Sequence, residues 1–126
     1  MMPARPDFVV GRILIAALFL INGLMLMRSG DFKFCESFMR GRGVPLCRAA
    51  LVITIVLQLI GGVMILVGWE TWWAAGVLFV WMFPATYVFH AFWRAPPELK
   101  PNETYHLLKN MALAGALLML VSVYRP

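Results

Sequence analysis

Charged residues are scarce in this chain of 126 residues, since only 13% are Asp, Glu, Lys or Arg. A soluble domain usually carries about 25% charged residues. Apolar and aromatic residues make up 62% instead, and a chain this short cannot bury that much apolar surface away from water. Disordered, collagen-like and disulfide-rich scaffolds are excluded as well, because each requires a composition that this sequence lacks. The composition predicts an integral membrane protein.

Residues that carry chemistry are also few, with six acidic residues, two cysteines and two histidines. The sequence has no nucleotide-binding loop, Ser-His-Asp arrangement or paired carboxylates, so we assign no catalytic residues and leave open whether the protein is an enzyme. Nucleic-acid binding is excluded because the net charge of +5 is not gathered in a solvated basic domain. Cys35 and Cys47 lack C-x-x-C spacing. We expect both cysteines to be thiols if their loop is cytoplasmic. If the loop lies on the periplasmic side of the membrane instead, a disulfide between them is the alternative.

Four apolar stretches have the length of a membrane-spanning helix. A hydrocarbon core about 30 Å thick requires about 20 helical residues. The stretches are residues 9–27, 49–68, 71–92 and 107–124. Strands of a membrane barrel would be shorter and would alternate in polarity, so we expect helices. The sequence predicts an all-α fold, a single four-helix transmembrane bundle over residues 1–126. Its first helix is expected to be retained, because no signal-peptide cleavage site follows it.

The connections between the stretches predict the orientation in the membrane. An even number of spans places both termini and the turn at Trp69-Glu70 on one side. Basic residues are concentrated on the other side, which carries Arg28, Lys33, Arg40, Arg42, Arg48, Arg94, Lys100 and Lys109 against Arg5, Arg12 and Arg125. By the positive-inside rule, the two longer loops are cytoplasmic and the termini periplasmic. Arg12, one turn into the first stretch, is expected to extend its side chain to the lipid headgroups.

The first loop, residues 28–48, contains a short amphipathic segment. Apolar side chains alternate there with charged ones, the apolar residues being Phe32, Phe34, Phe38 and Met39. This pattern is typical of a helix that lies in the membrane interface. Gly43 and Pro45 are expected to end the segment before the second span.

Polar residues inside or beside the spans are the most informative about function, because lipid makes each of them costly. The candidate site residues gather toward one end of the bundle, with Gln58 deeper, and are Asn22, Gln58, Tyr87, His90, Trp93, His106, Lys109 and Asn110. One interpretation is structural, with hydrogen bonds between helices and side chains anchored at the interface. The other is a polar pocket for the headgroup of a quinone or lipid. Pro84 favours the pocket, since a proline inside a helix kinks it and opens space.

A haem or metal site is a further alternative. His90 and His106 end and open neighbouring stretches on the same membrane face, and imidazole binds iron, zinc and copper. No further patterned ligand accompanies them, so we assign no metal ligands, and no cofactor is implied by the residues.

Small residues predict close helix contacts, in the second span at Gly61, Gly62 and Gly68 and in the fourth at Ala112, Gly115 and Ala116. The same glycine and alanine faces could serve a second copy of the chain or another protein. The oligomeric state is therefore open.

Several of these segments together resemble the DoxX family of small four-helix bacterial membrane proteins. The resemblance is carried by Gly11-Arg12 with Leu14, Ala17, Leu18 and Phe19, then Asn22-Gly23, Gly43-Val44-Pro45, Gly61-Gly62 with Gly68, Phe89-His90-Ala91-Phe92-Trp93 and residues 106–115. The last two resemble the family's H-x-F-W and H-x-x-K-N-x-A-x-x-G boxes. Two positions differ: Gln58 stands where an acidic residue is expected, and the basic residue expected late in the first helix is matched only by Arg28.

The resemblance implies a multi-pass protein of the bacterial inner membrane. Relatives are linked to membrane redox systems, among them a subunit of thiosulfate:quinone oxidoreductase and an oxidative-stress complex. We therefore expect a non-catalytic membrane subunit or anchor of a redox complex, surrounded by lipid and associated with membrane or peripheral redox subunits. The alternative is a protein that binds quinone or lipid in the polar pocket. Haem or metal oxidoreductase chemistry is disfavoured.

Overall fold

The apolar stretches form long α-helices, because a helix satisfies its backbone hydrogen bonds within itself and needs no water to do so. The computed structural model describes residues 5–43, 45–89, 97–98 and 100–126. Its helices are α1 (Pro6–Leu26), α2 (Ser29–Gly41), α3 (Cys47–Val67), α4 (Thr71–Phe89) and α5 (Lys100–Tyr124). Between them, the described residues form turns and coil and no strand. The all-helical prediction is confirmed.

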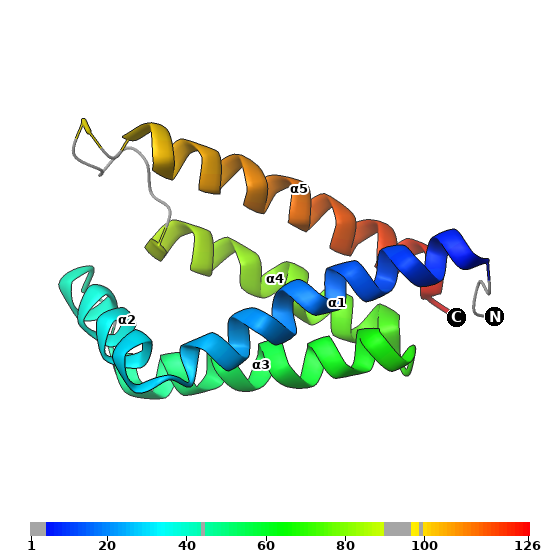
Figure 1. The fold of residues 1–126 in the computed structure, drawn as a ribbon, viewed down its shortest axis with the longest axis horizontal. Helices are drawn as coiled ribbons and strands as arrows, with labels where there is room; N and C mark the ends of the chain where they lie inside the picture. The colour runs from blue at the N-terminus through cyan, green and yellow to red at the C-terminus, as the bar shows by residue number, and fades with distance from the viewer. Residues whose placement is uncertain (1–4, 44, 90–96, 99) are drawn as a thin grey trace.

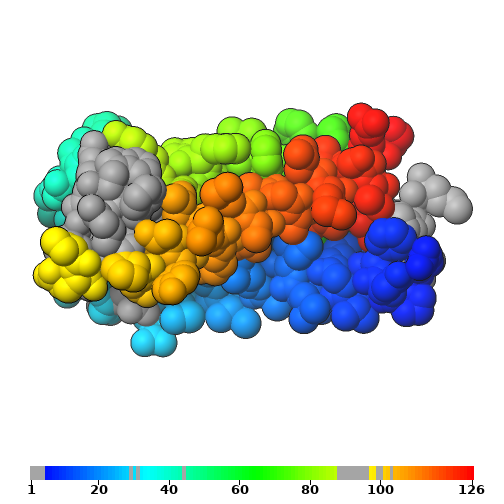
Figure 2. Space-filling view, turned by 90° about the horizontal axis from the view of Figure 1, so that it is seen from above, coloured from blue at the N-terminus to red at the C-terminus, as the bar shows by residue number. Residues whose placement is uncertain are grey.

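The four longer helices run along the molecule, and α2 lies at one end of it (Figure 1). The start of α1 and the end of α5 lie at the opposite end, together with the turn between α3 and α4. α1 packs mainly on α3, and α5 packs mainly on α4, whereas α1 and α5 make few contacts with each other. Figure 2 looks onto α5, which runs from its orange start on the left to its red end on the right, where the dark blue start of α1 also lies.

Three helical segments among the described residues are long and apolar enough to cross a membrane, namely Pro6–Leu26, Cys47–Val67 and Thr104–Tyr124. The predicted bundle had a fourth span at residues 71–92. The described part of that segment is α4, which is helical through Pro84 and contains no charged residue. Residues 90–92 lie outside the described residues.

α5 begins at Lys100, seven residues before the predicted start at residue 107. The third loop is correspondingly shorter than the predicted residues 93–106. Pro101 accounts for the earlier start, because a proline in the first helical turn lacks only an N–H that has no partner there. Polar residues 102–106 thus extend the helix beyond its apolar part.

The turn between α3 and α4 lies where the sequence predicts it. Gly68 ends α3 with a left-handed φ of 82°, and the N–H groups of Gly68 and Trp69 donate to the Met64 carbonyl at 2.9 and 3.0 Å. Glycine adopts this conformation without steric cost. Gly68 therefore closes α3, and the predicted role of this glycine as a helix contact is replaced by a role in the turn.

The amphipathic segment of the first loop forms α2, and α3 covers part of its apolar face. Phe32, Cys35 and Met39 pack in one cluster with Leu51 and other residues of α3. Phe34, by contrast, is 70% exposed. Some apolar residues of α2 thus pack on α3, whereas Phe34 lies on the surface of the protein.

Glycines let α1 and α3 approach closely. A Cβ atom at Gly62 would lie 2.8 Å from Leu20 Cγ, and a Cβ at Gly23 would lie 2.9 Å from Leu59 Cδ2. Each helix therefore inserts a leucine against a glycine of the other. Gly61 receives Leu78 of α4 in the same way, at 3.0 Å from its would-be Cβ to Cδ1. The predicted contacts at Gly61 and Gly62 are confirmed.

The predicted contact at Gly115 is wrong within this chain. A Cβ at Gly115 would meet no atom within 4 Å, apart from its own helix backbone, and the residue is exposed. α5 presents this position away from α4, so its small side chain is not required by the fold.

We predict that Gly62→Ala leaves the protein about 1.5 kcal/mol less stable than Gly115→Ala. Both variants gain the same intrinsic helix preference of alanine over glycine. Only at Gly62 must the new methyl group displace Leu20 from a tightly packed interface. Denaturation by sodium dodecyl sulfate (SDS) in detergent micelles, followed by circular dichroism, measures the difference. Equal stability of the two variants would contradict the close contact.

Arg12 and Tyr124 connect α1 to α5 near the chain termini. Nη1 of Arg12 lies 3.4 Å from the Tyr124 hydroxyl, and the guanidinium lies 5.8 Å from the ring centroid. Tyr124 is 6% exposed and belongs to the main apolar cluster with Ala16 and Leu120. Arg12 thus contacts a buried aromatic ring at the end of α5. The expected extension of its side chain toward the headgroups stays a prediction.

Candidate functional site

The close approach of α1 and α3 brings together two amide side chains. Asn22 Nδ2 donates to Gln58 Oε1 at 2.6 Å. Gln58 is 1% exposed, and its Nε2 has no hydrogen-bond partner among the described residues. A buried amide nitrogen without an acceptor is costly, so the described residues leave one strong donor of Gln58 unused.

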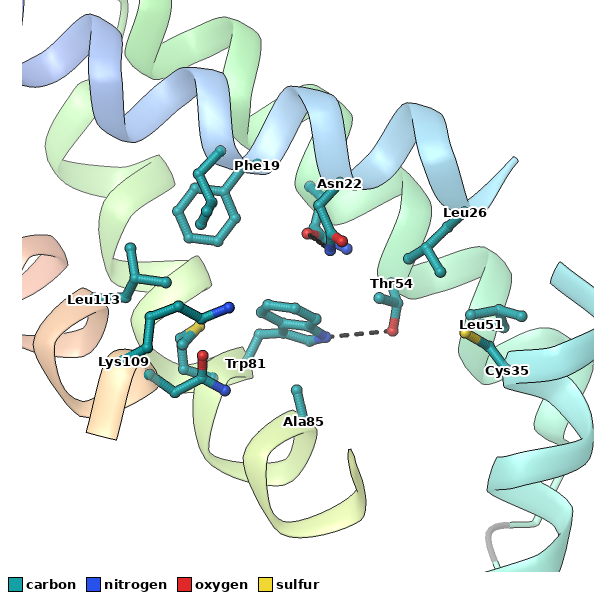
Figure 3. A pocket seen from close by; sticks show the side chains of 14 residues that line it. Phe19, Asn22, Leu26, Cys35, Leu51, Thr54, Trp81, Ala85, Lys109 and Leu113 are labelled. Carbon is teal, nitrogen blue, oxygen red and sulfur yellow. Dashed lines mark hydrogen bonds between the residues drawn. The ribbon is translucent and has the colours of Figure 1, made fainter. Parts of the chain in front are cut away.

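Two further hydrogen bonds connect the helices around this pair. Trp81 Nε1 of α4 donates to Thr54 Oγ1 of α3 at 3.3 Å, as Figure 3 shows. Asn110 Nδ2 of α5 donates to Thr86 Oγ1 of α4 at 3.0 Å. The indole N–H and the Asn110 amide are thereby used within the protein.

A cavity of about 240 Å³ lies between the helices at this level. Residues of all five helices line it: Leu18, Phe19, Asn22, Leu26, Cys35, Leu51, Thr54, Gln58, Trp81, Met82, Ala85, Lys109, Asn110 and Leu113. In Figure 3, Asn22 points into it from α1, and the side chain of Lys109 extends from α5 toward Trp81. We refer to this cavity as the pocket.

The residues that line the pocket are apolar apart from a few polar groups. Lysine is the only charged residue type among them, and none of these fourteen residues is acidic. Acidic side chains are paired elsewhere in the molecule: Asp7 pairs with Arg5 at 2.8 Å, and Glu36 pairs with Arg40 and Arg48 at 3.6 and 3.5 Å. The pocket therefore combines apolar walls with one cation and a free amide donor, as is usual for a site that binds an amphiphile.

The structure brings four of the eight predicted site residues into the pocket, namely Asn22, Gln58, Lys109 and Asn110. Tyr87 and His106 do not line it; Tyr87 is 52% exposed and His106 is half-buried. His90 and Trp93 lie outside the described residues. The pocket therefore includes Lys109 and Asn110 from the histidine-bearing end of the bundle but, among the described residues, neither Tyr87 nor His106.

Three pocket residues whose side chains can donate a hydrogen bond, Cys35, Thr54 and Trp81, were not among the predicted site residues. Thr54 precedes Gln58 by one helical turn, and Cys35 shares the helical face of Phe32 and Met39, so spacing alone could have placed both. Trp81 gave no such signal, because an aromatic residue in an apolar span is usually core.

A redox or metal centre would require paired cysteines or a cluster of metal-ligating side chains. Cys35 and Cys47 form no disulfide; Cys47 is buried and Cys35 half-buried. Among the described residues, no group of three or more His, Cys, Asp or Glu side chains is placed to hold a metal ion.

Long apolar helices around a pocket with a few polar groups define a helical membrane protein. The DoxX family model matches residues 8–91, which is two thirds of the chain, and the chain belongs to the DoxX family. The match includes Asn22, Gln58 and Trp81 but ends before α5. The resemblance at residues 106–115, with Lys109 and Asn110, lies outside the matched region and stays a prediction. No curated protein and no solved structure matches the chain.

Proposed function

We propose that this DoxX protein binds a membrane-soluble amphiphile, a quinone or a lipid, in the pocket. The observation that carries the proposal is the unpartnered Nε2 of Gln58, which is 1% exposed and lines a cavity with apolar walls. In lipid, such a donor lacks water, so a ligand oxygen is the acceptor that fits it.

A quinone fits the donor set of the pocket. Its carbonyl oxygens would accept hydrogen bonds from Gln58 and Lys109, and the apolar lining would contact its ring and tail. When bound, a quinone supplies two-electron, two-proton redox chemistry. The chain's own residues would hold the headgroup and exclude water from it.

Filling the pocket is expected to lower ligand occupancy about tenfold. Ala85 lines the pocket, and Ala85→Phe adds an aromatic ring there. Ala112 on α5 is exposed and does not line the pocket, so Ala112→Phe is the matched control. Native mass spectrometry and organic extraction of the purified proteins measure the bound quinones and lipids. If Ala85→Phe retains the same bound molecules as Ala112→Phe, the pocket is not the binding site.

We also propose that α4 is a fourth span and that the protein is a multi-pass protein of the bacterial inner membrane. The absence of charge in α4 and its packing beside α3 and α5 support this topology. The concentration of basic residues at the α2 end supports a cytoplasmic location for that end. Reporter fusions at the C-terminus test it, since a periplasmic terminus activates alkaline phosphatase but leaves green fluorescent protein dark.

We further propose that the protein is a non-catalytic subunit of a redox complex. The support for this proposal is the exposed face of α5 around Gly115, where a helix of another chain, or of a second copy, could approach closely. Gly115→Leu is expected to leave folding intact and to remove proteins that co-purify with the wild type. A wild-type chain that never co-purifies with another protein would contradict the proposal.

A further inference from the structure

Most polar groups that line the pocket already have partners within the protein. The Trp81 indole binds Thr54, the Asn110 amide binds Thr86, and the Asn22 amide binds Gln58. The Gln58 amide nitrogen remains without a partner among the described residues. Lys109 is the one charged residue of the lining, so the pocket carries a cation and a free N–H donor.

Lys109 supplies the charge of the pocket from near the start of the apolar part of α5. That part begins at residue 107, because residues 102–106 are polar, so Lys109 lies two positions into it, about 3 Å along the helix axis. The residue is exposed in the structure. Its side chain extends toward Trp81 and the interior of the pocket (Figure 3). An ammonium directed into a pocket with apolar walls is stabilised by an anionic oxygen brought by a ligand.

Given the proposed ligand-binding function, we infer that the pocket selects an amphiphile with a carboxylate headgroup, such as a long-chain fatty acid. The Lys109 ammonium and the Gln58 amide donate to the carboxylate oxygens, and both are donors that an anionic oxygen accepts well. The chain of the ligand contacts apolar lining residues, among them Leu18, Leu26 and Leu113.

Carboxylate selectivity distinguishes this inference from binding of a neutral quinone. A neutral carbonyl satisfies Gln58 but leaves the charge of Lys109 unbalanced. A carboxylate satisfies both groups and adds a charge-assisted hydrogen bond, which corresponds to about a tenfold gain in affinity or more.

Equilibrium binding to the full-length protein in a non-ionic detergent tests the inference, with dodecanoate and methyl dodecanoate as probes. Wild type is expected to bind the acid at least tenfold more tightly than the ester. Lys109→Met is expected to lose about tenfold in affinity for dodecanoate and to bind the ester as before. Lys109→Arg keeps the charge and is expected to keep the preference. Lys33→Met removes a lysine from the exposed surface of α2 and should change neither affinity.

The outcomes separate this inference from the proposed function. Equal binding of acid and ester, or a preference for the acid that survives Lys109→Met, overturns the carboxylate assignment. Tighter binding of dodecyl phosphate than of dodecanoate overturns it as well, in favour of a phosphate headgroup. A further outcome is that decylubiquinone binds, that Ala85→Phe abolishes its binding, and that dodecanoate binds no more tightly than methyl dodecanoate. In that case only the headgroup inference fails. If no probe binds, the proposed ligand-binding function fails with it.

Discussion

Asn22→Leu is expected to lower the free energy of unfolding by about 2 kcal/mol. The substitution removes the 2.6 Å hydrogen bond from Asn22 Nδ2 to Gln58 Oε1. Interhelical hydrogen bonds in membranes contribute about 0.6 kcal/mol on average, so the lost bond explains only part of the effect. The larger part arises at Gln58, which is 1% exposed and would retain neither an acceptor nor a donor. Leaving a buried polar group unsatisfied costs about 1–3 kcal/mol.

The double variant Asn22→Leu with Gln58→Leu provides the decisive comparison. Removing both amides eliminates the unsatisfied group, so stability should return to within about 0.5 kcal/mol of wild type. Asn102→Leu, at an exposed position on α5, controls for the change of residue type. SDS titration followed by circular dichroism gives all four values. A double variant no more stable than Asn22→Leu alone would show that the pair does not act as a unit.

The secondary structure was predictable from the sequence because the physical signal for it is long and redundant. Some twenty consecutive apolar residues permit only a helix in lipid, so the α1 and α3 assignments differ from the structure by three residues at most. The start of α5 was missed because residues 102–106 are polar, and hydropathy detects where a helix enters lipid rather than where it begins. Pro101 indicates the first turn of the helix, but a search for apolar stretches does not take proline into account.

The site was predictable only in part, because helical spacing describes one helix at a time. Asn22 and Gln58 stood out as polar residues within apolar spans, and the structure joins them by a hydrogen bond. Which face of α4 meets α3 depends on packing such as that of Leu78 against Gly61. No property of residue 81 alone predicts that arrangement, and Trp81 was therefore not among the predicted site residues. Tyr87 looked equally suitable by spacing, yet it is 52% exposed and outside the pocket.

Tyr124→Ala is expected to destabilise the protein by about 2 kcal/mol. Truncating a buried aromatic residue costs 3–5 kcal/mol in soluble proteins, but part of that value is transfer from water, which does not apply to a helix in lipid. The remaining loss is the packing of a ring that is 6% exposed, together with its contacts to Arg12. Tyr124→Phe keeps the ring and loses only the 3.4 Å hydrogen bond, so about 0.5 kcal/mol is expected.

Tyr105→Ala is the matched control, since Tyr105 also lies on α5 but is 71% exposed, and its truncation should leave the SDS midpoint almost unchanged. The comparison also bears on ligand binding. α1 and α5 contribute Asn22 and Lys109 to opposite sides of the pocket, yet these helices contact each other little. The Arg12–Tyr124 contact is one of the few that hold them together, so Tyr124→Ala should weaken amphiphile binding although the residue does not line the pocket. Destabilisation without weaker binding would mean that α3 and α4 alone keep the pocket in shape.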